Sequence, residues 1–410
     1  MPENDHALTR RDVPMLAFLG GLTSLTAIAV DISLPAIPEL ARQFAVDPAT
    51  THAIVSLFLL GYAVMQPVYG PLSDRIGRKP VLLAGLVLFA LASLLSPFAD
   101  QIDTLYLLRV LQGMGAGCGP VLARAILRDR FSGARAERAM ALVMFAMAFG
   151  PLIAPTIGGM LVESSGVGSV FWALTALALT FLTLSALWYS ETLSRPARHL
   201  RPRAIARSYL EVLGHPVARY DILAGGFIYA SMLCYISASP AILIDGFGVG
   251  PGTYGYYFAL SAAALLVGAL LNARLLKHLP SGTVTLFGLA ISLTGGGLML
   301  VLAITGYVQP LAVALPAAAV VSGLAIVLPN TTARAMQPFG HQAGTASAAI
   351  GSVQITLGVA AGYVTGLCFD GTARPLGIAL SLCSLMAGVA FLKARRTTDQ
   401  TMTGGQHAGH

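Results

Sequence analysis

The sequence predicts an all-α integral membrane protein in which twelve transmembrane helices form two pseudo-symmetric six-helix halves. The chain has 410 residues, of which 56% are hydrophobic and only 10% are charged, whereas soluble domains have ~45–50% apolar and ~25% charged residues. The apolar residues occur in long continuous runs, without the alternation that a membrane β-barrel requires. This composition argues against an ordinary soluble enzyme, a disordered protein and a nucleic-acid binder.

Twelve apolar runs are candidates for crossing a bilayer, which takes ~20 mostly apolar residues per helix. Polar residues, glycines and prolines separate the runs. We expect helices 1 to 12 at 14–38, 51–72, 80–98, 104–127, 138–162, 168–190, 218–244, 253–275, 283–305, 309–332, 342–367 and 375–394.

The basic residues indicate the direction of these helices. An even number of helices places both termini on one side, and the side rich in Lys and Arg is cytoplasmic. Of the 25 Lys and Arg residues, 22 fall on the side assigned to the cytoplasm. Arg42 and Arg374 fall on the far side, and Arg109 lies within a predicted helix. The net charge of +7 is therefore explained by topology. We expect both termini in the cytoplasm and no nucleic-acid partner.

The chain divides at its longest polar stretch, 191–217, which is rich in arginine and is expected to be a cytoplasmic linker. It separates an N-terminal half, 1–190, from a C-terminal half, 218–396, and residues 397–410 are expected to form a disordered tail. The helical parts of the two halves, 14–190 and 218–394, have 177 residues each, and equal six-helix halves are typical of the parallel repeats of secondary transporters. The four cysteines lack metal-binding spacing, and the chain has no nucleotide-binding loop and no hydrolase motif. We therefore expect no metal, no cofactor and no enzyme activity.

Residues 70–79, between predicted helices 2 and 3, read GPLSDRIGRK. The glycines of this segment permit a tight turn, and its aspartate can face a helix N-terminus or pair with an arginine. The alternative is an ordinary basic cytoplasmic loop, which would require neither the glycines nor the aspartate. The motif resembles the signature G-x-L-[SA]-D-R-x-G-R-[KR] of the major facilitator superfamily. The resemblance implies a cytoplasmic gate formed by Gly70, Asp74, Arg75, Gly77, Arg78 and Lys79.

Predicted helix 4 contains a charged residue, Arg109, which costs ~2.5–3.5 kcal/mol within a membrane unless it faces a cavity or a partner. The alternative is an arginine that reaches the nearby interface. The segment from 105 to 117 resembles the family motif L-x-x-x-R-x-x-Q-G-x-G of proton-coupled members. The resemblance assigns Arg109 and Gln112 to proton coupling.

Predicted helix 1 ends with the sequence DISLPAIP, residues 31–38. It resembles the motif D-x-x-L-P-x-[IVL]-P of drug:proton antiporters, especially the bicyclomycin/chloramphenicol-resistance branch. At 1.5 Å per residue, Asp31 lies ~10 Å and Arg109 ~8 Å below the same membrane surface. Burial favours a protonated carboxylate and a nearby arginine favours an ionised one, so Asp31 is the expected proton site. A static salt bridge between the two residues is the alternative.

Predicted helix 5 is rich in glycine and proline, which kink a helix and let a neighbour approach closely. It resembles the antiporter motif G-x-x-x-G-P-x-x-G-G, with Ala154 at a position that is usually glycine; generic helix packing is the alternative. The residues that carry this motif are Gly150, Pro151, Pro155, Gly158 and Gly159.

A mixture of polar, aromatic and methionine side chains suits an adaptable pocket for an amphipathic molecule. Tyr235 stands at the position of the second half that corresponds to Asp31. For each such residue ordinary packing of the bundle is the alternative. The candidates for substrate binding are Tyr62, Gln66, Met144, Tyr235 and Gln354.

The resemblance implies a monomeric, proton-coupled antiporter of the bacterial inner membrane that exports amphipathic drugs similar to chloramphenicol or bicyclomycin. Its partners would be the small-molecule substrate, protons and the lipid bilayer. Two alternatives remain. The same fold can export a small metabolite or import one with protons. A protein of another class, a membrane sensor or an integral-membrane enzyme, would need no buried carboxylate.

Overall fold

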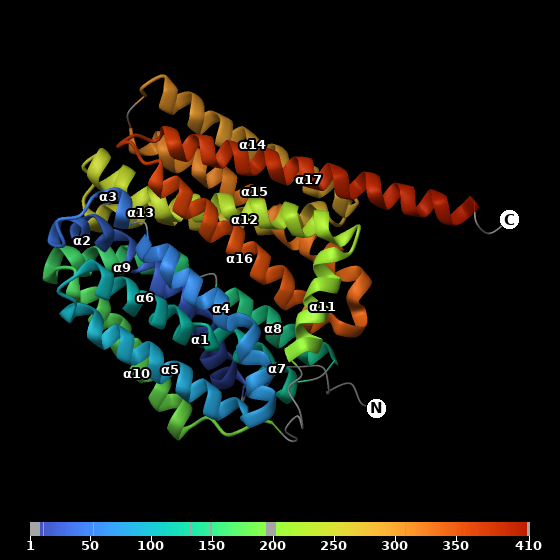
Figure 1. Cartoon of the computed structure of the whole chain (residues 1–410), viewed down its shortest axis with the longest axis horizontal. Coiled ribbons are helices and arrows are strands. Elements are labelled where there is room, and N and C mark those ends of the chain that lie inside the picture. Colours follow the sequence, from blue (N-terminus) through green and yellow to red (C-terminus); the bar gives the residue numbers. More distant parts are fainter. Residues whose placement is uncertain are drawn as a thin grey trace. The chain divides into compact units, whose positions relative to one another are not determined.

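The computed structural model describes residues 9–407, apart from 11, 52, 132, 148–149, 194–201 and 308. Within these residues the chain is helical and has no β-strand, and eleven helical segments are long and apolar enough to cross a membrane (Figure 1). The predicted all-α membrane fold is confirmed. The remaining predicted span, 138–162, is covered by two helices whose junction at 148–149 lies outside the described residues.

Contacts between residues divide the chain into two compact units. Unit 1 comprises 1–200 together with 250–259, and unit 2 comprises 201–249 with 260–410. The helices that begin in unit 1 are α1 (Val13–Asp31), α2 (Ile37–Gln43), α3 (Pro48–Thr51), α4 (Ala53–Ile76), α5 (Arg78–Leu95), α6 (Ile102–Ala116), α7 (Cys118–Arg130), α8 (Gly133–Met147), α9 (Gly150–Ser165), α10 (Gly168–Leu187) and α13 (Pro251–Leu275).

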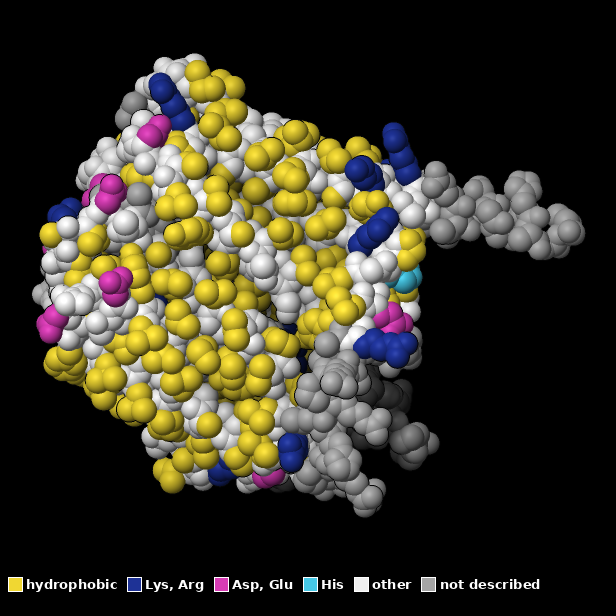
Figure 2. Space-filling view, in the orientation of Figure 1, with side chains coloured by type: hydrophobic (Ala, Val, Ile, Leu, Met, Phe, Trp, Pro, Cys, Tyr) yellow, Lys and Arg dark blue, Asp and Glu magenta, His cyan; other side chains and the backbone are white. Residues whose placement is uncertain are grey.

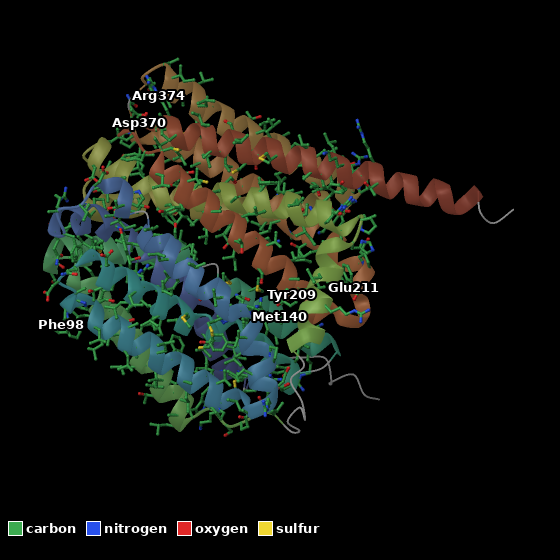
Figure 3. The ribbon with its side chains drawn as sticks, viewed as in Figure 1. Phe98, Met140, Tyr209, Glu211, Asp370 and Arg374 are labelled. Atoms are coloured by element: carbon green, nitrogen blue, oxygen red, sulfur yellow. The ribbon has the colours of Figure 1, made fainter. Side chains whose placement is uncertain are left out.

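The remaining helices belong to unit 2, which also receives the later part of α13. They are α11 (Pro202–Gly214), α12 (Ala218–Pro240), α14 (Ser281–Ile304), α15 (Pro310–Met336), α16 (Ala343–Leu367) and α17 (Arg374–His407). In its core, α12 packs against α15, α16 and α17. Asp370 and Arg374 mark the turn that joins α16 to α17 (Figure 3).

Proline and glycine explain where the predicted spans are interrupted. Predicted helix 1 is α1, a 3₁₀ turn at Leu34–Ala36, and α2, because Pro35 and Pro38 cannot donate the hydrogen bonds that would continue α1. Predicted helix 4 is α6 followed by α7, with Gly117 between them.

Two predicted boundaries differ from the structure. Residues 250–259, expected in the C-terminal half, belong to unit 1, because glycines allow close backbone contact: a Cβ on Gly255 would overlap Thr156 of α9. The tail expected to be disordered from residue 397 is helical in α17 as far as His407.

Apolar side chains dominate the surface as well as the core. Figure 2 shows hydrophobic side chains over most of the visible surface, with few charged ones among them. Leu107, Val267 and Leu270 each expose 60% or more of their area. A surface of this kind is suited to lipid tails. The amphipathic helix α11 instead buries Val212 in a cluster with Ile222 of α12 and Ile350 of α16. It leaves Tyr209 partly buried and Glu211 exposed (Figure 3).

Candidate functional site

A fully buried arginine organises the polar interior of unit 1. The Arg109 guanidinium donates to the carbonyl oxygen of Ile54 (3.2 Å) and to Ser33 Oγ (3.1 Å). It also donates to Gln112 Oε1 at 2.6 Å and lies 4.7 Å from the ring centroid of Phe58. Arg109 is 0% exposed, so the alternative of an arginine that reaches the interface is wrong.

Gln112 extends this network to a further helix. Its amide Nε2 donates to Ser93 Oγ of α5 at 2.7 Å, while its oxygen accepts from Arg109. Together, Arg109 and Gln112 connect α6 to α4, to α5 and to the turn that follows α1. The cost of burying the arginine is offset because its donors meet acceptors in three directions.

Asp31, the last residue of α1, is the second ionisable group in this region. It is 3% exposed, and it forms no hydrogen bond or ion pair with any described residue. The static salt bridge between Asp31 and Arg109, which the similar depth of the two residues made an alternative, is therefore absent. The reason is local: α1 stops at Asp31, and the chain turns so that Ser33 reaches the guanidinium.

The glycines of α9 pack against the segment that carries Asp31. A Cβ on Gly158 would overlap the carbonyl oxygen of Ile32, and one on Gly150 would lie 3.2 Å from the Ile28 side chain. A Cβ on Gly159 would overlap the carbonyl oxygen of Pro251, at the start of α13. Within the same helix Pro155 is buried and Pro151 is half-buried. The glycine-rich motif of α9 thus forms a helix surface that the backbone can approach closely at two places, Ile32 and Pro251.

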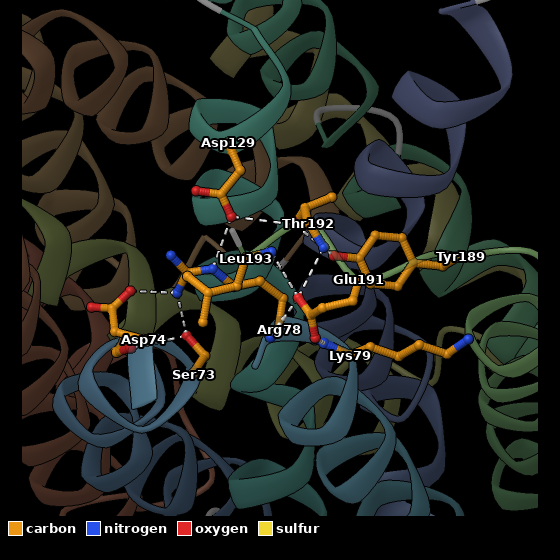
Figure 4. Close-up of polar contacts among 10 residues, drawn as sticks. Ser73, Asp74, Arg78, Lys79, Asp129, Tyr189, Glu191, Thr192 and Leu193 are labelled. Carbon is orange, nitrogen blue, oxygen red and sulfur yellow. Dashed lines mark hydrogen bonds and ion pairs between the residues drawn. The ribbon is translucent and has the colours of Figure 1, made fainter. Parts of the chain in front are cut away.

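The cluster around Arg78 forms at the junction of α4 and α5 (Figure 4). Its guanidinium bonds Asp74 Oδ1 at 2.6 Å and Asp129 Oδ2 of α7 at 3.0 Å, and it donates to Ser73 Oγ at 2.7 Å. The side chain of Arg78 is 6% exposed, against 51% for Asp74 and 21% for Asp129. Arg75 is exposed. Asp129 was not identified from the sequence, because nothing local links it to residues 70–79.

Glu191, also missed from the sequence, binds the N-terminus of α5. Its carboxylate accepts from the backbone N–H groups of Arg78 and Lys79, both at 3.0 Å. Burial raises its pKa, but these bonds and those from the N–H groups of Thr192 and Leu193 prevail and hold the pKa of Glu191 below its ordinary value. Lys79 Nζ donates to the carbonyl oxygen of Ala186.

The two motif glycines have different surroundings. Gly77 has a positive φ of 107° between α4 and α5, where glycine is strongly favoured. Gly70 lies inside α4, and a Cβ there would meet nothing within 4 Å. The expectation of a tight turn at Gly70 is therefore wrong, because α4 continues to Ile76.

The candidate substrate residues divide between the units and differ in accessibility. In unit 1, Met144 is 54% exposed, and the half-buried side chains of Tyr62 and Gln66 are hydrogen-bonded to each other. In unit 2, Tyr235 is 1% exposed and accepts from Ser261, so it is a packing residue in this structure.

Gln354, the remaining candidate in unit 2, is half-buried and donates to Thr332 Oγ1 at 3.3 Å. A buried ion pair that the sequence analysis missed lies in the same unit: Arg334 Nε is 3.1 Å from Asp221 Oδ1. Asp221 is 1% exposed, so the pair joins α12 to α15 in the interior.

Comparison with known proteins places this geometry in a family. A sequence model of the Major Facilitator Superfamily matches residues 19–363. This chain belongs to the major facilitator superfamily. It is therefore a multi-pass membrane transporter rather than an enzyme.

Several relatives within the superfamily match nearly the whole chain. Multidrug resistance protein D of Escherichia coli is 30% identical over 386 residues, which cover 93% of this chain and 96% of the relative. A bicyclomycin resistance protein homolog of Haemophilus influenzae is 28% identical over 382 residues, covering 91% and 94%.

The solved structures show the same fold at lower identity. A bacterial homolog of the human lysosomal transporter Spinster, in an inward-facing conformation, has a TM-score of 0.74 and 16% identity over 95% of this chain and 98% of its own. A D-xylose–proton symporter also has a TM-score of 0.74, with 15% identity over 92% and 97% of the two chains. These likenesses establish the major facilitator fold of this transporter.

Proposed function

We propose that this facilitator is a proton-coupled antiporter that exports small amphipathic drugs across the bacterial inner membrane, with both termini in the cytoplasm. The observation that carries the proposal is Asp31, a buried carboxylate. It has no hydrogen-bond or ion-pair partner among the residues that the structure describes, and it lies in a segment contacted by the glycines of α9. The names of its relatives, which include a multidrug resistance protein and a bicyclomycin resistance protein homolog, support the choice of substrate.

In this proposal Asp31 binds the proton. A carboxylate that is buried without a hydrogen-bond donor is costly in its ionised form, so proton loss requires water or a substrate beside it. Arg109 does not neutralise Asp31 directly. It holds the turn at Ser33, two residues beyond Asp31, and so positions the segment on which protonation occurs.

The gate of the proposal is the cluster around Arg78. Its bonds join the end of α4, the start of α5 and the end of α7, and Glu191 ties the same α5 N-terminus to the segment after α10. Breaking such a cluster exposes paired charges to water, where each pair is weak. It can therefore open and re-form during alternating access. Inward proton movement across ~100 mV supplies ~2.3 kcal/mol per charge.

The proposal is tested with everted membrane vesicles that contain the full chain and carry a pH indicator. Chloramphenicol should cause proton movement with the wild type and none with Asp31→Asn. Asp100→Asn, at an exposed position, is the matched control and should behave like the wild type. Proton movement that persists in Asp31→Asn would remove Asp31 from the coupling role. Absence of movement in the wild type would contradict drug antiport by this chain.

A further inference from the structure

Two cysteines contact each other in the interior of unit 2. The side chains of Cys234, in α12, and Cys383, in α17, are hydrogen-bonded to each other. Both thiols are free and buried, with exposed fractions of 0% for Cys234 and 8% for Cys383. The two residues are too far apart in the sequence for local spacing to indicate a pair.

The packing of α12 against α17 supports this contact independently. The two helices run in opposite directions (Figure 1), and Ile228 of α12 and Ala390 of α17 belong to one buried cluster. Ile228 precedes Cys234 by ~9 Å and Ala390 follows Cys383 by ~10 Å at 1.5 Å per residue. Antiparallel helices that meet at Ile228 and Ala390 therefore also meet at the two cysteines.

A threonine of α16 completes the surroundings of the pair. Thr365 Oγ1 lies 3.3 Å from Cys234 Sγ and donates to the carbonyl oxygen of Ala361 at 2.8 Å. A chain in which Cys383 donates to Cys234, and Cys234 to Thr365, satisfies both thiols. Three helices of unit 2 thus hold the two sulfur atoms together.

The other two cysteines have different surroundings. Cys118 is buried in unit 1 and donates to the carbonyl oxygen of Leu82 at 3.9 Å, whereas Cys368 is exposed. Among the described residues neither of them contacts another cysteine. An isolated buried thiol ordinarily acts as a small hydrophobic residue. Cys118 is therefore a matched control for a buried thiol, and Cys368 for an exposed one.

Both contacting cysteines lie nearer to one membrane surface than to the other. Cys383 is ~13 Å along α17 from its start at Arg374, and Cys234 is ~9 Å before the end of α12 at Pro240. In the proposed topology Arg374 lies on the far side of the membrane from the basic loops. Disulfides persist in the oxidising environment of that side, and hydrogen peroxide is small and uncharged enough to enter the span.

We propose that Cys234 and Cys383 form a redox-active dithiol, which a peroxide converts to a disulfide that fastens α12 to α17. One sulfur attacks a peroxide oxygen, the O–O bond breaks, and one water leaves as a sulfenic acid forms. The second sulfur attacks the first, the S–O bond breaks, and a second water leaves. Two thiols and one hydrogen peroxide thus give one disulfide and two waters.

Contact between the sulfurs offsets their slow reaction with the oxidant. A thiol buried in apolar surroundings is weakly reactive, and Cys383 is the expected site of the first attack because it is the more exposed of the two. The second step requires no diffusion, since the partner thiol is already in place. This inference goes beyond the export function and does not depend on it.

The test uses the purified full chain in detergent with Cys368→Ala, which removes the exposed thiol. The protein is treated with hydrogen peroxide, denatured, and labelled with a polymer-linked maleimide that shifts a gel band once for each free thiol. Labelling should fall from three thiols to one, the remaining thiol being Cys118, and dithiothreitol should restore it. Peptide mass mapping should identify a link between Cys234 and Cys383.

Two variants in the Cys368→Ala background serve as controls. Cys118→Ala should still lose two thiols, whereas Cys383→Ala should keep both of its thiols because Cys234 has no partner. Persistence of all three thiols in the parent protein, a link that includes Cys118, or equal thiol loss in Cys383→Ala would overturn the pair. These measurements require no substrate, so their failure is distinguishable from a failure of drug export.

The same oxidation should raise the melting temperature of the parent protein. A disulfide between these residues closes a loop of ~150 residues and so constrains the unfolded chain. Reduction with dithiothreitol should reverse the increase. A protein that carries the link but melts at the temperature of its reduced form would overturn the fastening of α12 to α17.

Discussion

Arg109 and Asp31 are both buried in unit 1, yet the guanidinium bonds Ser33, two residues beyond the carboxylate, and not Asp31 itself. The two residues therefore have different physical roles. Arg109 stabilises the packing of several helices, whereas Asp31 is a buried carboxyl group that bonds no described residue. A residue that stabilises and a residue that titrates should respond differently to mutation.

Arg109→Ala should lower the free energy of unfolding by at least ~3 kcal/mol. It would leave Gln112, Ser33 and the Ile54 carbonyl without their donor, at ~1–3 kcal/mol for each buried unsatisfied group. Asp31→Asn should stay within ~1 kcal/mol of the wild type, since it removes no bond. Unfolding of the purified proteins in detergent measures both changes. Equal losses in the two variants would contradict the division of roles.

Gly70 and Gly77 should also differ in how much their replacement by alanine changes the free energy of unfolding. Gly77→Ala should destabilise the protein by ~1–2 kcal/mol, because its positive φ disfavours a Cβ and the added atom would approach Glu191. Gly70→Ala should be neutral or stabilising by up to ~1 kcal/mol, because alanine favours the helix in which Gly70 lies. Thermal unfolding of the two variants provides the comparison. A larger loss from Gly70→Ala would indicate a requirement for glycine in another conformational state.

Much of the fold was predictable because membrane spans are a local property of sequence. About twenty apolar residues mark a helix wherever it packs, and the prolines at 35 and 38 also mark the interruption of the first span. The depth of Asp31 and Arg109 followed from helix rise, but depth does not specify the direction in which a side chain points. The turn after α1 decides that direction, and it places Ser33 beside Arg109.

The partners in the cluster around Arg78 could not be predicted in the same way. Asp129 and Glu191 approach from segments 51 and 113 residues away, and neither belongs to a motif that the sequence analysis recognised.

Acid should weaken the attachment of Glu191 to α5. The folded state holds the pKa of Glu191 below its ordinary 4.5, so the ionised carboxylate stabilises the fold at pH values above 4.5. That contribution is lost as the pH falls from 4.5 through the lowered pKa. In Glu191→Gln it should be missing throughout, so melting temperature should fall less steeply on acidification below 4.5.

The control for this acid titration is Glu211→Gln, at an exposed position of α11 (Figure 3). It should reproduce the wild-type dependence of melting temperature on pH. If Glu191→Gln and Glu211→Gln both follow the wild-type curve, the four backbone bonds of Glu191 contribute nothing to stability in this pH range.

Asp129 should matter more to Arg78 than Asp74 does, although only Asp74 belongs to the motif. A double-mutant cycle of Arg78→Ala with Asp129→Asn should give a coupling energy of ~1–3 kcal/mol, because both side chains are largely shielded from water. The same cycle with Asp74→Asn should give less than ~1 kcal/mol, since half of Asp74 is exposed and water screens the pair.

Arg75→Ala is the control for these cycles, because Arg75 is exposed and forms no ion pair within the described residues. It should change the free energy of unfolding by no more than ~0.5 kcal/mol. A coupling energy for Asp74 as large as that for Asp129 would mean that burial does not rank the two bonds. The stabilising contact of the cluster would then lie within residues 70–79, and the contact with Asp129 of α7 would not contribute more to stability than the contact with Asp74.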